Sequence, residues 1–241
     1  MKDYAEAVAR LRVFFGHQSV GGDIIEGMKP WIVASEVTEN QTASPSTSFH
    51  HALIGTNTVP LSKLDAFDRL LHAEERRQHV DVAMAKFCFI DFDANTDVNA
   101  LFAAYAEEMK KLEQELPQTT LVHFTAPLTT VQGGIRGWLK HHLGGNAWGE
   151  KENVKRNAYN ELIRSSYPKE LVFDLAKFEA TLPDGHLDTY EVDGHPIPRL
   201  RADFTDDGGH LNDRGRQEIA RALLRFLGTV PLKGRAVQSS Q

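Results

Sequence analysis

Two short polar stretches, one near each end of the chain, carry residue types that can do nucleophilic chemistry. The first, GHQSVGG at positions 16–22, presents Ser19 between a strand-like apolar run and a helix-like segment. The second, DGGH at positions 207–210, presents a carboxylate and an imidazole three residues apart. In a serine hydrolase a histidine takes the serine proton while an aspartate fixes the histidine tautomer. Ser19, His210 and Asp207 therefore predict a catalytic triad.

The position of Ser19 suits this chemistry. Its own N–H would lie in the first turn of the following helix, where the helix dipole favours a developing oxyanion. Glycines 16, 21 and 22 would let the backbone turn tightly there. Taken alone, the same serine is better explained as a helix N-cap than as a nucleophile. The nucleophile interpretation therefore requires His210 to reach the same edge of the sheet.

The glycine-rich loop around His210 does not match a calcium loop. Counted from Asp203, Thr205 occupies the third place and Arg214 the twelfth, where Asp or Asn and a bidentate Glu are needed. The remaining histidines lack the i, i+4 spacing of a helical zinc site. We therefore expect no metal and no organic cofactor.

Apolar runs rich in Val, Ile and Phe alternate with amphipathic segments, which is the pattern of parallel strands joined by crossover helices. This predicts a three-layer α/β/α sandwich with a five-stranded parallel sheet, whose sites lie at the carboxyl ends of the strands. The expected strands are 12–15, 51–54, 80–90, 120–126 and 171–174, and the clearest helices are 61–78, 97–116, 151–164 and 212–227.

We expect one domain over residues 1–230, followed by a flexible tail at 231–241. Residues 34–48 are polar and turn-rich. Residues 128–150 are too long for a plain connection, so they predict a lid or a substrate-facing insertion. Trp138 and Trp148 in that insertion could contact a sugar ring or an acyl chain, or simply pack a lid on the body.

A resemblance to a known family rests on three blocks of residues. Ser19 in the first strand-to-helix turn, Gly55 in ALIGTN, and the DGGHLNDRG stretch, in which Asp207 to Gly215 read Asp-x-x-His-x-Asn-x-x-Gly, together resemble the SGNH/GDSL hydrolase superfamily of esterases and lipases. The resemblance implies a flavodoxin-like sheet order and Ser19 as nucleophile. It also implies that the Gly55 N–H joins the Ser19 N–H in the oxyanion hole.

The chain departs from the family before the serine and in a further block at the end of the third strand, as a divergent branch would. His17 and Gln18 precede the serine where relatives carry Gly and Asp; Gln18 could orient the turn and His17 could line the pocket. At the end of the third strand the family expects Gly-x-Asn-Asp, but here Ile90 replaces the asparagine and only Asp91 matches. Asn57 is a candidate replacement donor, and a simple turn asparagine is the alternative.

Two further polar residues are candidates for substrate binding. Lys86 could place positive charge near the site, or extend to water as lysines at strand edges do. Arg156 lies in KRNAYNEL with several other hydrogen-bonding groups, which could bind a substrate or form a solvated helix face.

Composition limits the function classes. Hydrophobic residues make up 41% and charged residues 25% of the 241 positions, as in ordinary globular proteins. The formal charge of −6 with no basic stripe argues against nucleic acid as a partner. The single Cys88 excludes an internal disulfide and reads as a small buried hydrophobe. With no apolar signal core and no membrane span, we expect a cytoplasmic protein, or a secreted or periplasmic one if a leader has been removed.

The sequence thus predicts a serine esterase that cleaves a small acyl ester, such as an O-acetylated carbohydrate, through an acyl-enzyme. One alternative is an O-acyltransferase that uses the same triad on a sugar hydroxyl. Another is a non-catalytic member of the fold that only binds a ligand. The sequence gives no indication of the oligomeric state.

Overall fold

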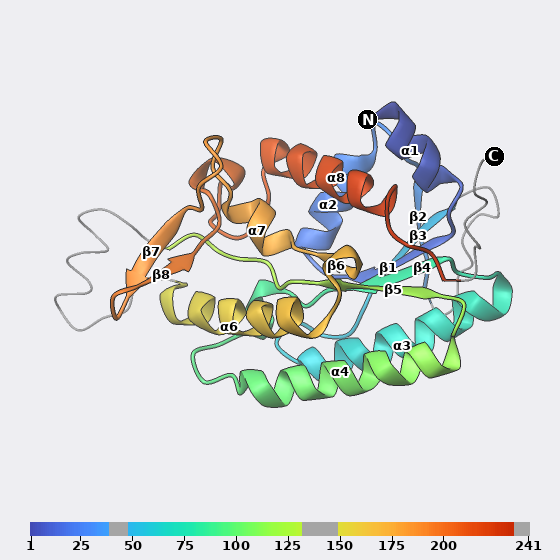
Figure 1. Ribbon diagram of the computed structural model, residues 1–241, viewed down its shortest axis with the longest axis horizontal. Helices are drawn as coiled ribbons and strands as arrows, with labels where there is room; N and C mark the ends of the chain where they lie inside the picture. Colours follow the sequence, from blue (N-terminus) through green and yellow to red (C-terminus); the bar gives the residue numbers. More distant parts are fainter. Residues whose placement is uncertain (39–47, 132–148, 234–241) are drawn as a thin grey trace.

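Six parallel strands form the central sheet, in the order β2-β3-β1-β4-β5-β6 (Figure 1). The computed structural model describes residues 1–38, 48–131 and 149–233. Leaving β2 aside, the strand order is the flavodoxin-like order that the resemblance implies. The strands are β1 (Val13–His17), β2 (Ala34–Glu36), β3 (Phe49–Leu53), β4 (Val82–Ala85), β5 (Thr120–Phe124) and β6 (Val172–Phe173).

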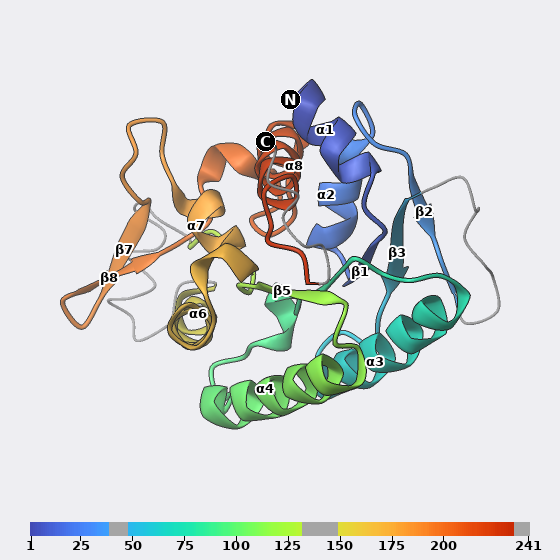
Figure 2. The ribbon, with the colours of Figure 1, turned by 45° about the vertical axis from the view of Figure 1, so that its right-hand side comes forward.

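Helices cover both faces of this sheet, which confirms the three-layer sandwich (Figure 2). Alternate residues of a strand point to opposite faces, so Phe14 and Phe15 of β1 enter two separate apolar cores. One face carries α1 (Lys2–Ala9), α2 (Val20–Met28), α7 (Leu175–Ala180) and α8 (Asp213–Leu227), and the other carries α3 (Pro60–Arg77), α4 (Val98–Glu115) and α6 (Glu150–Ser166).

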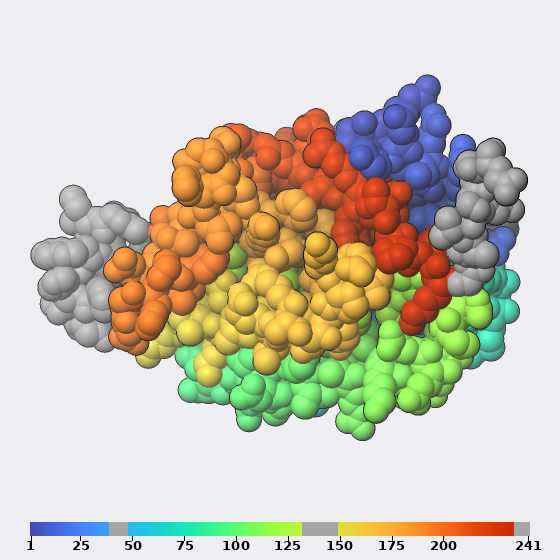
Figure 3. All heavy atoms as spheres, viewed as in Figure 1, coloured from blue at the N-terminus to red at the C-terminus, as the bar shows by residue number. Residues whose placement is uncertain are grey.

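The contact between α2 and α8 is unusually close. A Cβ atom at Gly27 would lie 2.2 Å from the carbonyl oxygen of Arg216, so only glycine lets the two helices approach this far. Figure 3 shows α8 (red) lying between the N-terminal residues (blue) and the orange and yellow segments of α7 and α6. This packing sets the first turns of α8 against the last turn of α2.

The structure corrects two of the expected elements. A sixth strand, β2, lies inside the stretch expected to be only polar and turn-rich, where it pairs with β3 at the sheet edge. The strand expected over 80–90 ends at Ala85, because the chain turns into a short 3-10 helix at Phe89–Asp91. The Asp91 carboxylate accepts the N–H of Cys88 and stabilises that turn. Cys88 itself is buried, as expected.

Some expectations concern residues beyond the described ranges. The lid prediction rests mainly on residues 132–148, which include Trp138 and Trp148 and lie outside the described residues. Among the described residues, β7 (Thr189–Val192) and β8 (His195–Pro198) form an antiparallel hairpin that is not among the elements expected from the sequence. Of the tail, Lys233 donates its N–H to Thr120 Oγ1 at 2.8 Å, so 231–233 pack on the body, and 234–241 are not described. No helix in the described parts is long and apolar enough to cross a membrane.

Candidate active site

Ser19 has an unusual backbone conformation. It lies directly between β1 and α2 with φ +46° and ψ −108°, a region that residues with a side chain rarely adopt. It occupies the N-cap position of α2, but its side chain makes no capping hydrogen bond. Strain of this kind at a polar residue, without the benefit of a cap, is typical of functional turns.

Asp207 and His210 form a direct pair. The His210 Nδ1 lies 2.6 Å from Asp207 Oδ2, and Asp207 Oδ1 accepts the N–H groups of Gly209 and His210. Partial burial raises the pKa of the Asp207 carboxyl, but these bonds outweigh it and hold the pKa well below its usual range. The carboxylate therefore stays ionised. The His210 side chain is 47% exposed, and its Nε2 atom has no partner among the described residues.

Asp23 connects this pair to the serine turn. Its Oδ2 accepts the N–H of Leu211 at 3.0 Å, and its Oδ1 pairs with the guanidinium of Arg216. Because Asp23 lies four residues after Ser19 and Leu211 follows His210, the two loops meet at one edge of the sheet. No hydrogen bond joins Ser19 Oγ to His210 in the described protein. Sequence reasoning missed Asp23, since its partners lie almost the whole chain away.

A turn after β3 lies beside the serine turn. Gly55 in this turn has φ +57°, and a Cβ there would lie 2.6 Å from the backbone nitrogen of Lys63, so the position requires glycine. The Gln18 side chain donates its Nε2 to the carbonyl oxygens of Ile54 at 3.2 Å and Gly55 at 3.1 Å. Within the described ranges, neither the Ser19 N–H nor the Gly55 N–H has a hydrogen-bond acceptor.

A buried ion pair joins the Gly55 turn to the turn after β4. Lys63 Nζ binds Asp91 Oδ2 at 2.5 Å and Asn57 Oδ1 at 3.0 Å, and Asp91 Oδ1 accepts the N–H of Thr58. The bond from Lys63 fixes the amide of Asn57, so its Nδ2 donors face away from the lysine. Beside Asp91, Ile90 is 47% exposed, which places an apolar side chain at the surface of this turn.

Three residues expected near the substrate are buried instead. His17 is 1% exposed and its Nε2 lies 3.0 Å from His51 Nδ1; burial, then the neighbouring His51 and Lys86, lower the pKa of His17. Lys86 is also buried, and burial lowers its pKa. Neither residue lines the depressions that the described residues form beside His210 and Gly55. The burial of Lys86 contradicts both expectations for it, a positive charge near the site and a side chain that extends to water.

Arg156 is the third of these buried residues. Its Nε donates to the carbonyl oxygen of Phe89 at 3.0 Å and its Nη1 to Thr129 and Asn153, while burial lowers its pKa to about 10. The Phe89 ring packs edge-on against the His210 imidazole, with 5.3 Å between ring centroids. Arg156 therefore holds the backbone of Phe89, whose ring packs against the His210 imidazole. Neither direct substrate contact nor a solvated helix face fits its burial.

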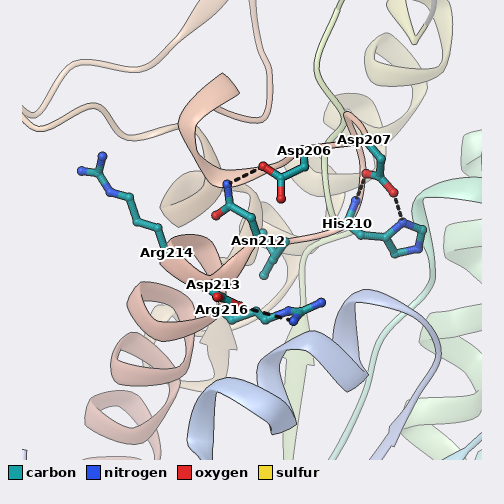
Figure 4. A pocket seen from close by; sticks show the side chains of 8 residues that line it. Asp206, Asp207, His210, Asn212, Asp213, Arg214 and Arg216 are labelled. Carbon is teal, nitrogen blue, oxygen red and sulfur yellow. Dashed lines mark hydrogen bonds and ion pairs between the residues drawn. The ribbon is translucent and has the colours of Figure 1, made fainter.

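Two depressions flank the site. One, of about 500 Å³, has Asp207 and His210 at one end and Arg214 at the other (Figure 4). The other, of about 660 Å³, begins at Gly55 and Thr56 and extends along α3. Its lining mixes apolar side chains such as Leu53 with carboxylates, hydroxyls and a guanidinium: Glu36, Thr38, Ser62, Asp65 and Arg69.

Among the described residues one group of side chains has metal-ligand chemistry, namely Asp68, His72 and Glu115. The His72 nitrogens already pair with both carboxylates, and Lys111 also pairs with Asp68. Glu115 ends α4 ahead of β5, on the amino side of the sheet, so this group takes no part in the serine site.

Comparison with known proteins identifies the fold. No protein-family model matches the sequence, and no curated protein gives a significant match. One similar solved structure, from Streptococcus pneumonia, is assigned as a platelet activating factor; it is 16% identical, covers 93% of this chain and 89% of its own, and has a TM-score of 0.52. Another, from Desulfitobacterium hafniense DCB-2, is assigned to the lipolytic G-D-S-L family; it is 10% identical, covers 89% and 99%, and has a TM-score of 0.50.

These similarities extend over 93% and 89% of the chain. The serine turn, the glycine turn and the Asp-x-x-His loop all lie at the carboxyl edge of the central sheet. The chain has the SGNH/GDSL hydrolase fold.

Proposed function

We propose that the protein is a serine hydrolase that cleaves a small acyl ester through an acyl-enzyme. The observation that carries the proposal is the ionised Asp207 bound to His210 on a loop that Asp23 ties to the strained serine turn. The fold is that of proteins assigned to a lipolytic family, which supports ester hydrolysis as the reaction.

In the proposed mechanism, Ser19 Oγ attacks the acyl carbon while His210 Nε2 takes the hydroxyl proton. Asp207 holds the proton on Nδ1 and stabilises the imidazolium. As the tetrahedral intermediate collapses, the bond to the alcohol breaks and His210 gives it the proton. A water molecule then attacks the acyl-enzyme, His210 takes its proton and returns it to Ser19, and a carboxylic acid leaves.

The oxyanion of each tetrahedral intermediate would be held by the N–H groups of Ser19 and Gly55. Their lack of protein acceptors within the described ranges supports this role. Asn57 would add a third donor through Nδ2, because Lys63 occupies its oxygen. One lost donor of this kind costs about 10²–10³ in rate, so the hole accounts for a large share of the catalysis.

The carboxylates, hydroxyls and guanidinium among the lining residues of the depression beside Gly55 favour an ester of a polar alcohol, such as an O-acetylated carbohydrate. Hydroxyls, carboxylates and a guanidinium can bind sugar hydroxyls, whereas a long acyl chain would need a more apolar surface.

The test is active-site labelling and turnover. The wild type should react with a fluorophosphonate probe at Ser19 and hydrolyse p-nitrophenyl acetate and acetylated sugars. Ser19→Ala should lose the label and reduce kcat by at least about 10³-fold. A wild type that neither labels at Ser19 nor hydrolyses any ester on the panel, or a Ser19→Ala variant as fast as wild type, would refute the proposal.

A further inference from the structure

The Gln18 side chain makes the only side-chain hydrogen bonds to the Ile54 and Gly55 carbonyls among the described residues, and it lies next to the proposed nucleophile in the chain. We propose that Gln18 is a positioning residue that locks the Ile54–Gly55 peptide plane and so aims the Gly55 N–H into the oxyanion hole. This inference rests on the proposed function, since it gives that N–H its purpose.

Covalent geometry couples the Ile54 carbonyl to the Gly55 N–H. The carbonyl of Ile54 and the N–H of Gly55 belong to the same peptide unit, and the described chain contains no cis peptide bond. In a trans peptide these two groups point in opposite directions. When Gln18 Nε2 holds the Ile54 oxygen at 3.2 Å, the direction of the Gly55 N–H is therefore fixed as well.

The Ile54–Gly55 peptide needs a hydrogen bond from a side chain to keep one orientation. Gly55 adopts φ +57°, and glycine moves between positive and negative φ at little cost. The hydrogen-bonded turn of this loop begins only at Thr56, whose carbonyl accepts the Val59 N–H. That turn therefore does not restrain the Ile54–Gly55 peptide, and rotation of this peptide would carry the Gly55 N–H away. The Ile54 N–H is fixed by the His17 carbonyl at 3.0 Å, but that bond restrains only the preceding peptide.

The backbone from which the Gln18 side chain extends is itself held in place by His17. His17 is buried, and its Nε2 contacts His51 Nδ1 on β3 at 3.0 Å. A Cβ at Gly21 would lie 2.3 Å from the His17 Cβ, so the first turn of α2 closes directly over this histidine. The His-Gln pair before Ser19 thus fastens the nucleophile turn to β3 and to the glycine turn beyond it.

The test compares two isosteric variants. Gln18→Glu places a carboxylate against two carbonyl oxygens, and Gln18→Met removes the donor without adding charge. Both should lower kcat, by about 10²-fold in Gln18→Glu, with KM changed less than about threefold and the melting temperature nearly unchanged. Gln118→Glu, at an exposed position, is the control for the added charge.

A second readout separates this inference from the proposed function. Crystal structures of wild type and Gln18→Glu should show the Ile54–Gly55 peptide in two different orientations, whether or not the protein turns over any ester. The inference is overturned if Gln18→Glu keeps the wild-type peptide orientation, or if its kcat on an active substrate stays within about twofold of wild type. If the wild type is inactive but the Ile54–Gly55 peptide is still reoriented in Gln18→Glu, the esterase proposal is refuted and the positioning role of Gln18 is retained.

Discussion

At the scale of single residues, Asp207 serves the backbone and a side chain together. Its Oδ1 accepts two backbone N–H groups that close the loop, while its Oδ2 binds the His210 imidazole. The carboxylate thus shapes the loop and also sets the histidine tautomer.

Asp207→Asn separates these two roles. The amide oxygen can still accept the backbone N–H groups, but the amide N–H₂ would face His210 Nδ1 and favour the wrong tautomer. We expect kcat to fall by about 10²–10⁴-fold with little change in the melting temperature. Asp206→Asn, at the neighbouring exposed aspartate, is the control and should keep full activity. Equal losses in both variants would mean that only loop charge matters.

The sequence was sufficient to predict which residues form the Asp207–His210 pair, because both lie in one short loop whose spacing fits hydrogen bonding. It could not predict the partners of Gln18 or Asp23, whose bonds reach Gly55 and Leu211 across the fold. His17, Lys86 and Arg156 were expected near the substrate because polar residues at strand and helix ends usually face solvent. Their burial depends on tertiary packing that no local pattern records.

At the scale of elements, the turn after β3 and the turn after β4 behave as one unit. Lys63 is almost fully buried in α3 and pairs with Asp91, which in turn accepts the N–H groups of Thr58 and Cys88. The same carboxylate explains why the strand expected over 80–90 ends early. The apolar residues that follow Ala85 continue the core after the backbone has left the sheet, so hydrophobicity alone overestimates the strand.

Lys63→Met should be strongly destabilising, because it leaves the Asp91 charge buried without a counter-ion. Loss of one partner of a buried pair typically costs about 3–5 kcal/mol in the free energy of unfolding. Urea denaturation measures this cost. Lys151→Met, at an exposed lysine, should change the free energy by less than about 0.5 kcal/mol.

The double variant Lys63→Met, Asp91→Asn should recover part of the loss, since it removes the unpaired charge. A Lys63→Met protein as stable as wild type would show that the pair does not hold the two turns together.

At the scale of the whole molecule, the three layers bury a titratable group between sheet and helix. Glu179 of α7 is completely buried; its Oε2 accepts the Leu128 N–H at 2.7 Å, and its Oε1 has no partner in the described protein. Burial raises the pKa of Glu179 to about 8, although the Leu128 bond and then Lys86 and Arg156 oppose the shift.

This shift predicts how stability depends on pH. Between about pH 4.5 and 8 the folded protein keeps the Glu179 proton and the unfolded chain releases it. The contribution of this group to the free energy of unfolding therefore falls as pH rises, by roughly 1.4 kcal/mol per pH unit. Glu179→Gln keeps an acceptor for Leu128 and removes the titration. Urea unfolding at several pH values should show that the free energy of unfolding of Glu179→Gln rises relative to that of wild type across that interval. If the two free energies change with pH in the same way, the assignment is contradicted.

The bonds of residues 231–233 have a practical consequence for handling the protein. Lys233 binds Thr120 at the start of β5, so the carboxyl end of the described chain lies on the side of the sheet opposite the serine turn. A bead or sensor chip attached at this end would leave the proposed catalytic edge facing solution. Immobilised protein should therefore remain open to large, even polymeric, substrates.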